Sequence, residues 1–426
     1  MRGSWQRRLA AAALAFIAAG SVAVEAQELR DRERSLVASR RIAEDLRKAR
    51  MHYGPFYLLS SIQLADIGYD QEFFVPTSDT TSGFTFGIAA PQRLYITPNK
   101  KTYFSIDVTP EWARFQGQQA NGSSNQWGLK SRADVQFLLN HLYFDAYVIR
   151  NNELRADTGE MASLLTQRNI EVGTTGEFKY SSRTSLTYTA LTRSQHFPIE
   201  KGKFQPDLPV NLLDRSEHTY RASLGHKTFP LTSVILAGEY SGYSFAEAVF
   251  KNSHRSYGGV GLVYETGRSD IRVEGGYTRL DFLQANQKDF KGGTGGINLR
   301  HRLTDRWRAA AGVSRDLTFS VFADNNYFIA NRANISTEAA FSPRLSVNAS
   351  YTLVQNTYDV PTAGAKPDNR VALRRDRISF PSVGWTYSSG SWLTGGFDVG
   401  YLKRTSNFPV GETEGIRIII RLSVTP

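Results

Sequence analysis

The sequence predicts an all-β fold, a transmembrane antiparallel β-barrel of the outer-membrane type, and three observations indicate it. The chain of 426 residues contains many runs in which polar and apolar residues alternate. These runs are about ten residues long, the length of a tilted strand that crosses a bilayer. Past the N-terminal region no apolar stretch is long enough to form a transmembrane helix. The connections between the runs are alternately short and long, as in outer-membrane barrels.

The alternation is clearest in residues 332–353. From Arg344 to Leu353 every odd-numbered residue is apolar or aromatic and every even-numbered residue is polar. The preceding run alternates in a similar way, and Ser342–Pro343 joins the two as a tight turn. Successive side chains of a strand point to opposite faces, so each run has one apolar and one polar face. The mean hydropathy of −0.36 does not oppose a membrane barrel, because only half of each strand faces lipid.

The first 26 residues predict a secretory signal peptide. Arginines at positions 2, 7 and 8 precede the apolar stretch Leu9–Gly20, and Val24–Glu25–Ala26 has small residues at the cleavage positions. The chain has no cysteine, which fits export through an oxidising compartment without disulfides. We therefore expect a mature protein that leaves the cytoplasm.

The next segment, residues 27–52, predicts a basic helix on the periplasmic side. Leu29, Leu36, Ala43 and Leu46 lie loosely on one helical face. One interpretation is a solvated leader that positions the first strand. The other is a docking element, or a gate at the mouth of the barrel. Both stay open from the sequence.

Residues 53–426 predict a barrel of about eighteen strands. The long connections share one side, and the short turns share the other; the long ones are 66–82, 116–126, 150–169, 196–217 and 359–376. An even number of strands places the N- and C-termini on the same side, which we expect to be the periplasm of a Gram-negative cell. A β-propeller is disfavoured because no blade motif repeats at about 40 to 50 residues.

The start of the barrel resembles a known family. Gly54–Pro55–Phe56 leads into the first strand, and Gly68–Tyr69–Asp70 follows. This opening resembles that of the outer-membrane β-barrel porins of the second β-barrel porin type, often linked with exopolysaccharide export. The resemblance implies a location in the cell outer membrane. It also implies periplasmic exopolysaccharide export components as partners. The barrel itself predicts two more partners, outer-membrane lipid and the barrel assembly machinery.

The lumen is where we expect the function to reside. A barrel of about eighteen strands is too wide for side chains to fill, so a water-filled channel is the default. Arginine dominates the polar faces from residue 272 onward, and such a wall would favour anionic solutes or an acidic exopolysaccharide. The alternative is a structural network in which acids neutralise these bases. The candidate pore-lining residues are Lys130, Arg132, Arg221, Arg272, Arg300, Arg302, Arg308, Arg332, Arg344, Arg417 and Arg421.

Other function classes have little support in the sequence. The seven histidines are scattered, and no metal-binding or catalytic motif occurs, so we predict no enzyme, cofactor or metal site. Basic residues alternate along strands instead of clustering, which disfavours nucleic-acid binding. Two alternatives to an open channel remain. One is a structural or docking barrel whose lumen is plugged, for which the 196–217 connection is suited. The other is a hydrolase at the rim.

Overall fold

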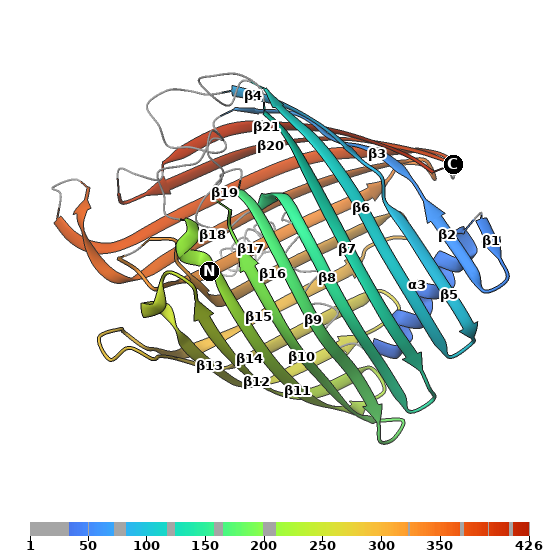
Figure 1. The fold of residues 1–426 in the computed structure, drawn as a ribbon, viewed down its shortest axis with the longest axis horizontal. Helices are drawn as coiled ribbons and strands as arrows, with labels where there is room; N and C mark the ends of the chain where they lie inside the picture. Colours follow the sequence, from blue (N-terminus) through green and yellow to red (C-terminus); the bar gives the residue numbers. More distant parts are fainter. Residues whose placement is uncertain are drawn as a thin grey trace, which may run out of the picture.

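A computed structural model describes residues 34–49, 51–71, 82–116, 124–156, 165–198, 210–322, 324–366, 370–390, 392–408 and 412–425. The predicted signal peptide lies outside these ranges, as do the first residues of the predicted basic helix. The described residues form one closed antiparallel barrel with one α-helix at its N-terminal side (Figure 1). No helix in the described ranges is both long and apolar enough to cross a bilayer.

After one N-terminal helix, the described chain consists almost entirely of β-strands. Helix α3 spans Arg34–Lys48, and two short 3-10 helices, η1 (Val210–Leu213) and η2 (Val249–Lys251), lie in connections. The strand segments are β1 (Met51–Tyr53), β2 (Phe56–Ser60), β3 (Ile62–Gln71), β4 (Ser82–Ala89), β5 (Gln92–Asn99), β6 (Thr102–Gln116), β7 (Ser124–Leu138), β8 (Leu142–Ala156), β9 (Leu165–Lys179), β10 (Thr184–His196), β11 (Arg215–Phe229), β12 (Thr232–Phe245), β13 (Ser253–Glu265), β14 (Ser269–Phe282), β15 (Phe290–Arg302), β16 (Trp307–Phe319), β17 (Tyr327–Ala340), β18 (Leu345–Ala365), β19 (Arg370–Ser389), β20 (Leu393–Ser406) and β21 (Thr413–Val424).

The wall has eighteen strands, as the sequence predicts. Segments β2 and β3 are two pieces of the first wall strand, and β4 and β5 are two pieces of the second, because β4 and β5 both pair with β6. Segment β1 is a short hairpin arm that pairs only with β2 among the described residues. The last strand, β21, pairs antiparallel with β3 and closes the barrel. The predicted Ser342–Pro343 turn joins β17 to β18.

Side-chain alternation sorts the wall into two faces. On β12, Val234, Leu236 and Tyr240 are exposed on the outside, whereas Glu239 and the buried Ser241 point inward. The same alternation follows β18, where Tyr351 is exposed outside and Asn356 is buried inside. An apolar outer belt over a polar interior is the pattern that a membrane barrel requires, because its outside meets hydrocarbon and its inside meets water.

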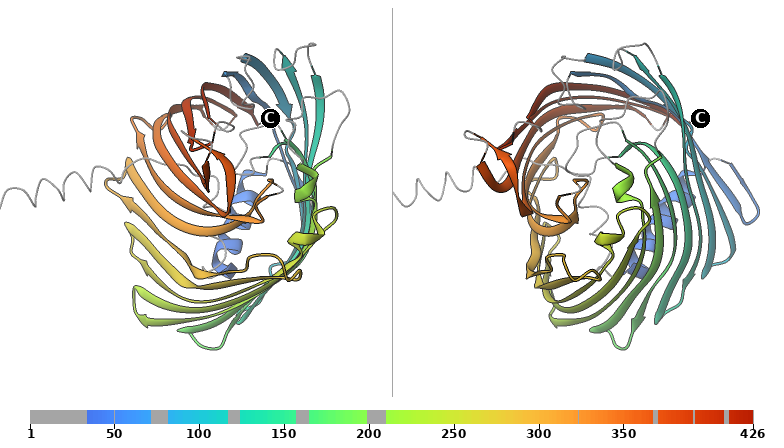
Figure 2. Two further views of the ribbon diagram at one scale, coloured as in Figure 1. Left: turned by 90° about the vertical axis from the view of Figure 1, so that its left-hand side faces the viewer. Right: turned by 60° about the vertical axis from the view of Figure 1, so that its left-hand side comes forward.

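Helix α3 lies inside the barrel near the short turns. It contacts β2, β8 and β9, and Ala38 and Ile42 are buried against this wall. Figure 2 shows the helix within the outline of the barrel in both views. The helix ends at Lys48, before the predicted end at residue 52, and β1 begins at Met51.

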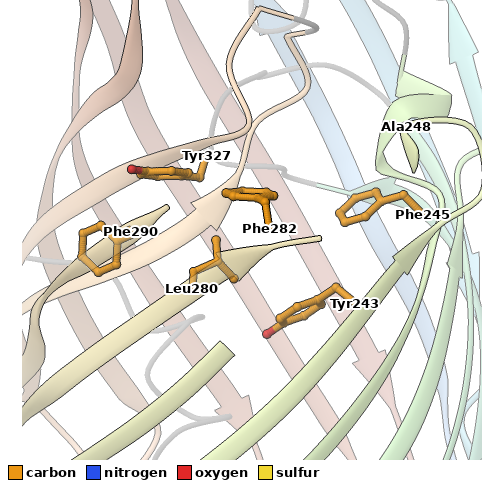
Figure 3. Packing of buried hydrophobic residues seen from close by; sticks show 7 residues of the cluster. All are labelled: Tyr243, Phe245, Ala248, Leu280, Phe282, Phe290 and Tyr327. Atoms are coloured by element: carbon orange, nitrogen blue, oxygen red, sulfur yellow. The ribbon is translucent and has the colours of Figure 1, made fainter. Parts of the chain in front are cut away.

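Apolar side chains fill part of the lumen near the long connections. Tyr243, Phe245, Leu280, Phe282 and Tyr327 come from the ends of three strands and pack together with Phe290 and Ala248 (Figure 3). The rings of Phe282 and Tyr327 stack with centroids 6.2 Å apart. This cluster narrows the lumen at the end opposite α3.

The connection predicted as a constriction, 196–217, is described only at its two ends. Phe197 and Leu213 are buried together with Val321 of the β16–β17 connection. His196 contacts Asp214, whose second carboxylate oxygen accepts a hydrogen bond from the backbone N–H of Phe197 at 2.7 Å. Both ends of the connection are therefore anchored to neighbouring residues. Residues 199–209 lie outside the described ranges.

Candidate functional site: the inner wall of the barrel

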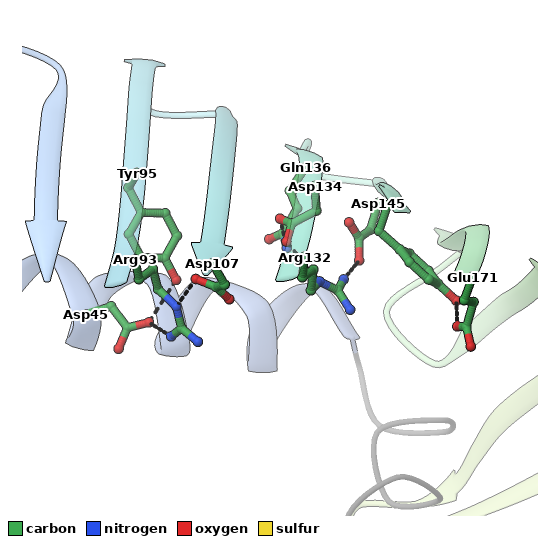
Figure 4. Close-up of polar contacts among 10 residues, drawn as sticks. Asp45, Arg93, Tyr95, Asp107, Arg132, Asp134, Gln136, Asp145 and Glu171 are labelled. Carbon is green, nitrogen blue, oxygen red and sulfur yellow. Dashed lines mark hydrogen bonds and ion pairs between the residues drawn. The ribbon is translucent and has the colours of Figure 1, made fainter. Parts of the chain in front are cut away.

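Helix α3 is tied to the inner wall by one carboxylate. Asp45 accepts hydrogen bonds from Arg93 Nη1 and from the Tyr95 hydroxyl, each at 2.7 Å (Figure 4). Arg93 Nε also contacts Asp107 on the adjacent strand β6. Arg93 and Tyr95 alternate onto the inner face of β5, so a single acid on a basic helix meets a polar pair on the wall. Sequence analysis did not identify this contact.

The next charged group along the wall is also compensated. Arg132 on β7 donates from Nε to Asp134 at 2.9 Å and from Nη2 to Asp145 on β8 at 3.0 Å. Gln136 Nε2 donates to the second oxygen of Asp134 at 2.8 Å (Figure 4). The guanidinium also lies 4.6 Å from the centroid of the Tyr147 ring. Asp134 and Asp145 are buried, so Arg132 balances two acids that would be costly to bury alone.

The pattern continues across β9 to β14. Glu171 accepts hydrogen bonds from the Tyr147 hydroxyl at 2.9 Å and from Arg193 Nε at 2.6 Å. Arg221 lies between Glu239 on β12, at 3.4 Å, and Glu274 on β14, at 2.9 Å. These contacts form a belt of alternating acids and bases, so the wall from β5 to β14 carries little unbalanced charge. This part of the wall fits the structural-network interpretation left open above.

The inner wall from β15 to β17 differs in charge balance, because it carries more bases than acids. Its inner face holds Arg300 and Arg302 on β15, Arg308 on β16 and Arg332 on β17. Arg302 Nη2 donates to the carbonyl oxygen of Gly267 at 2.9 Å. Arg308 and Arg332 form no ion pair with any residue in the described ranges. We call these four residues the arginine strip.

Few acids oppose the arginine strip on its own strands. Glu338 faces Arg308 in register, and Asp316 pairs with Arg255 of β13 at 3.1 Å. The residues between the arginines are small, including Ala310 and Gly312. The strip is therefore a positively charged stretch of wall with little side-chain bulk in front of it, in a barrel whose remaining charges are mostly paired.

The other predicted pore-lining residues fall into distinct settings. Lys130 pairs with Glu111 at 2.9 Å, Arg272 with Glu265 at 3.1 Å and Asp270 at 3.2 Å, and Arg421 with Asp398. Arg417 lies on the inner face of β21. Arg344 lies in the turn between β17 and β18, one residue before β18 begins, and its carbonyl oxygen accepts a hydrogen bond from the backbone N–H of Ser388 at 2.7 Å. It is therefore separate from the strand residues of the arginine strip, and its place in the pore lining stays a prediction.

A second charged cluster near the long connections escaped the sequence analysis. Asp376 accepts hydrogen bonds from Arg374 Nε at 3.1 Å and from the Tyr358 hydroxyl at 3.1 Å, and it contacts Arg404. Lys251 is fully buried, and its Nζ donates to the Ser320 carbonyl oxygen at 2.5 Å. The sequence analysis placed Asp376 in the predicted 359–376 connection, which was too long: β18 continues to Ala365 and β19 begins at Arg370, so Asp376 lies on a strand.

Comparison with known proteins supports the fold. No family model and no curated protein matches the chain. Among solved structures, the chain is similar to Pseudomonas aeruginosa OccK2 (OpdF), with 11% sequence identity and a TM-score of 0.50 over 86% of this chain and 98% of that one. A second structure of OccK2, in complex with glucuronate, gives 12% identity and a TM-score of 0.50 over 86% and 98%.

The outer membrane protein OpdK of the same organism gives 10% identity and a TM-score of 0.49 over 87% of this chain and 98% of that one. The two OccK2 structures establish that this chain has the fold of an outer-membrane porin barrel. The resemblance to the second β-barrel porin type stays a prediction, as does the link with exopolysaccharide export.

Proposed function

We propose that this protein is an outer-membrane channel for small anionic solutes, with both chain termini in the periplasm. The observation that carries the proposal is the arginine strip, Arg300, Arg302, Arg308 and Arg332, on the inner face of β15–β17. The rest of the wall supports it, because its acids and bases are largely paired. An ion that passes β15–β17 therefore meets a stretch of the described wall where bases outnumber acids.

The strip would select solutes by electrostatics and by geometry. A row of fixed positive charges lowers the energy of an anion in the lumen and raises that of a cation. The planar guanidinium presents paired N–H donors that match a carboxylate. The OccK2 structure in complex with glucuronate is a barrel of the same fold with a small sugar acid. A sugar acid of this size is our first candidate substrate.

Passage of an acidic exopolysaccharide is a narrower form of the proposal, and the family resemblance supports it. A polymer would have to pass α3 at one end and the cluster around Tyr327 at the other. Small solutes have no such requirement, and we place them first for this reason. The same two constrictions favour the second candidate function, a structural or docking barrel with a closed lumen.

Liposome swelling separates these functions. The refolded mature protein is reconstituted, and swelling rates are compared for glucuronate and glucose, which have nearly the same size. We expect faster entry of glucuronate. The variant Arg302→Ser/Arg308→Ser/Arg332→Ser should bring the two rates together, whereas Arg150→Ser, which removes one arginine from the outer face of β8, should leave their difference unchanged. Equal rates for the unmodified protein would refute anion selection, and no swelling by folded protein would support the closed barrel.

A further inference from the structure

The outer surface has different chemistry at its two ends. Near the short turns the outward side chains are aromatic or aliphatic; they include Phe137, Phe178, Phe229, Trp307, Phe341 and Tyr387. Near the long connections of β14–β20 the outward positions carry basic residues instead: Arg279, Lys291, Arg315, Arg375, Arg377 and Lys403. The short turns also carry exposed basic residues, among them Arg268 and Arg306, but the outward strand positions are apolar at that end and basic at the other.

Most of these basic residues have partners on the protein. Arg279 contacts Asp281 at 2.6 Å, Lys291 lies 3.9 Å from Asp289, and Arg315 donates to the carbonyl oxygen of Gly293 at 3.1 Å. Lys403 lies 3.8 Å from Glu414. Arg375 and Arg377 are the exceptions, because neither guanidinium forms an ion pair within the described part of the chain.

The run Arg374–Arg377 shows why these two residues require a separate explanation. Arg374 and Asp376 point inward, are buried, and bond to each other at 3.1 Å. Arg375 and Arg377 alternate with them and are exposed on the outside. Burial and their mutual ion pair explain the charges of Arg374 and Asp376. No ion pair within the described part of the chain explains the charges of Arg375 and Arg377.

Arg375 and Arg377 border a groove of about 570 Å³ on the outer surface. Its lining also includes Leu353, Gln355, Thr405 and Asn407, together with Asp376 and Ser406, which bond to each other on the inner face. Gln355 and Thr405 flank Arg377 in register on the two neighbouring strands. Two residues on one face of a strand are about 6.8 Å apart, so both guanidinium groups can reach one ligand. We call this feature the outer cationic groove.

We propose that the outer cationic groove binds the phosphorylated sugar headgroup of a glycolipid in the outer leaflet. Guanidinium groups bind phosphate through paired charge-assisted hydrogen bonds. The Gln355 amide and the Thr405 hydroxyl suit the hydroxyl groups of a sugar. Tyr351 and Val383, outward residues of the same strands nearer the short turns, are exposed to the acyl chains. The inference rests on the proposed outer-membrane location, with the long connections on the outside.

Native mass spectrometry of the full-length mature protein tests the groove. The protein, stripped of lipid in detergent, is titrated with bis-phosphorylated lipid A, and the ratio of lipid-bound to free protein is measured. We expect Arg375→Gln/Arg377→Gln to lower this ratio by about tenfold or more, because the variant loses the charge-assisted hydrogen bonds of two guanidinium groups to phosphate. The control Arg306→Gln, in the turn between β15 and β16, should bind as the unmodified protein does.

Two further arms identify the ligand. Lipid A from which both phosphates have been removed should bind at least about tenfold more weakly. Inorganic phosphate at millimolar concentration should not displace the lipid; displacement would assign the groove to free phosphate and overturn the proposal. Equal binding by the double variant, or by the dephosphorylated lipid, would also overturn it.

Failure of this proposal is distinguishable from failure of the channel. Ion selectivity of Arg375→Gln/Arg377→Gln, measured in bilayers without lipid A, should match that of the unmodified protein, because both residues lie outside the lumen. Loss of lipid binding with unchanged selectivity supports the groove. A selectivity change in this variant would place the two arginines in the conduction path and contradict their assignment to the outer surface.

Discussion

Release of helix α3 from the wall is the prediction that the structure specifies most fully. Asp45 is the acceptor for both Arg93 and Tyr95, at 2.7 Å each, and its side chain is only 14% exposed. Asp45→Asn removes the charge and keeps the shape. Arg93 retains Asp107, so the change weakens the docking of the helix and leaves the wall contact in place.

The expected magnitude follows from these contacts. Hydrogen bonds to charged groups contribute about 1.5–3 kcal/mol. Arg93 is 36% exposed, which reduces the value of its ion pair through solvent screening. A net loss of about 1–2 kcal/mol is therefore reasonable, and it corresponds to a rise of about 5- to 30-fold in the population of undocked helix.

The absence of cysteine makes this population measurable. Ala38→Cys places a thiol on the face of α3 that is buried against the wall. Its rate of reaction with a maleimide reports how often the helix undocks, and Asp45→Asn should raise that rate by the same factor. Glu44→Gln is the matched control, because Glu44 is the exposed neighbour on the same helix. Equal rates for Asp45→Asn and Glu44→Gln would refute the role given to Asp45.

Two further predictions concern the wall. Arg221→Ser leaves Glu239 and Glu274 without their shared cation and should lower the free energy of unfolding by about 3 kcal/mol; urea unfolding in vesicles measures this, and a loss below 1 kcal/mol would contradict the network. Gly276→Ala places a Cβ against the carbonyl oxygen of Gly258, so it should cost about 1–3 kcal/mol by the same assay. Gly258→Ala has open space and should be neutral.

The architecture of the wall was largely predictable from alternation. A strand that separates lipid from water must place apolar and polar residues on opposite faces, and Ile416, Ile418 and Ile420 of β21 follow this rule. The same parity placed Arg300, Arg302, Arg308 and Arg332 on the inner face. Their side of the sheet was therefore a property of the local sequence.

Which arginines are compensated was not predictable from the sequence. Arg221 contacts Glu274 across a sequence separation of 53 residues, and that contact depends on the register of several strands. The docking of α3 depends on Asp45 among basic neighbours and on wall residues that no helical periodicity identifies. Leu280 and Tyr243 also break the rule of a polar interior. In the sequence, this internal cluster could have been predicted only from apolar residues at inward positions near the ends of neighbouring strands.

The reversal potential in a salt gradient tests the central claim most directly, because it reports the net charge that a permeating ion meets. A unit charge about 7 Å away in water contributes about 0.6 kcal/mol, and screening at 0.1 M salt leaves about half of it. Three arginines then favour an anion by about 0.9 kcal/mol and disfavour a cation equally, so their removal should shift the anion-to-cation permeability ratio by about tenfold or more.

We predict anion-selective single channels for the refolded mature protein in a planar bilayer. Arg302→Ser/Arg308→Ser/Arg332→Ser should abolish this selectivity, and Arg150→Ser should preserve it. Cation-selective channels, or selectivity that is unchanged in the triple variant, would contradict the assignment of the arginine strip as the element that sets the charge of the lumen.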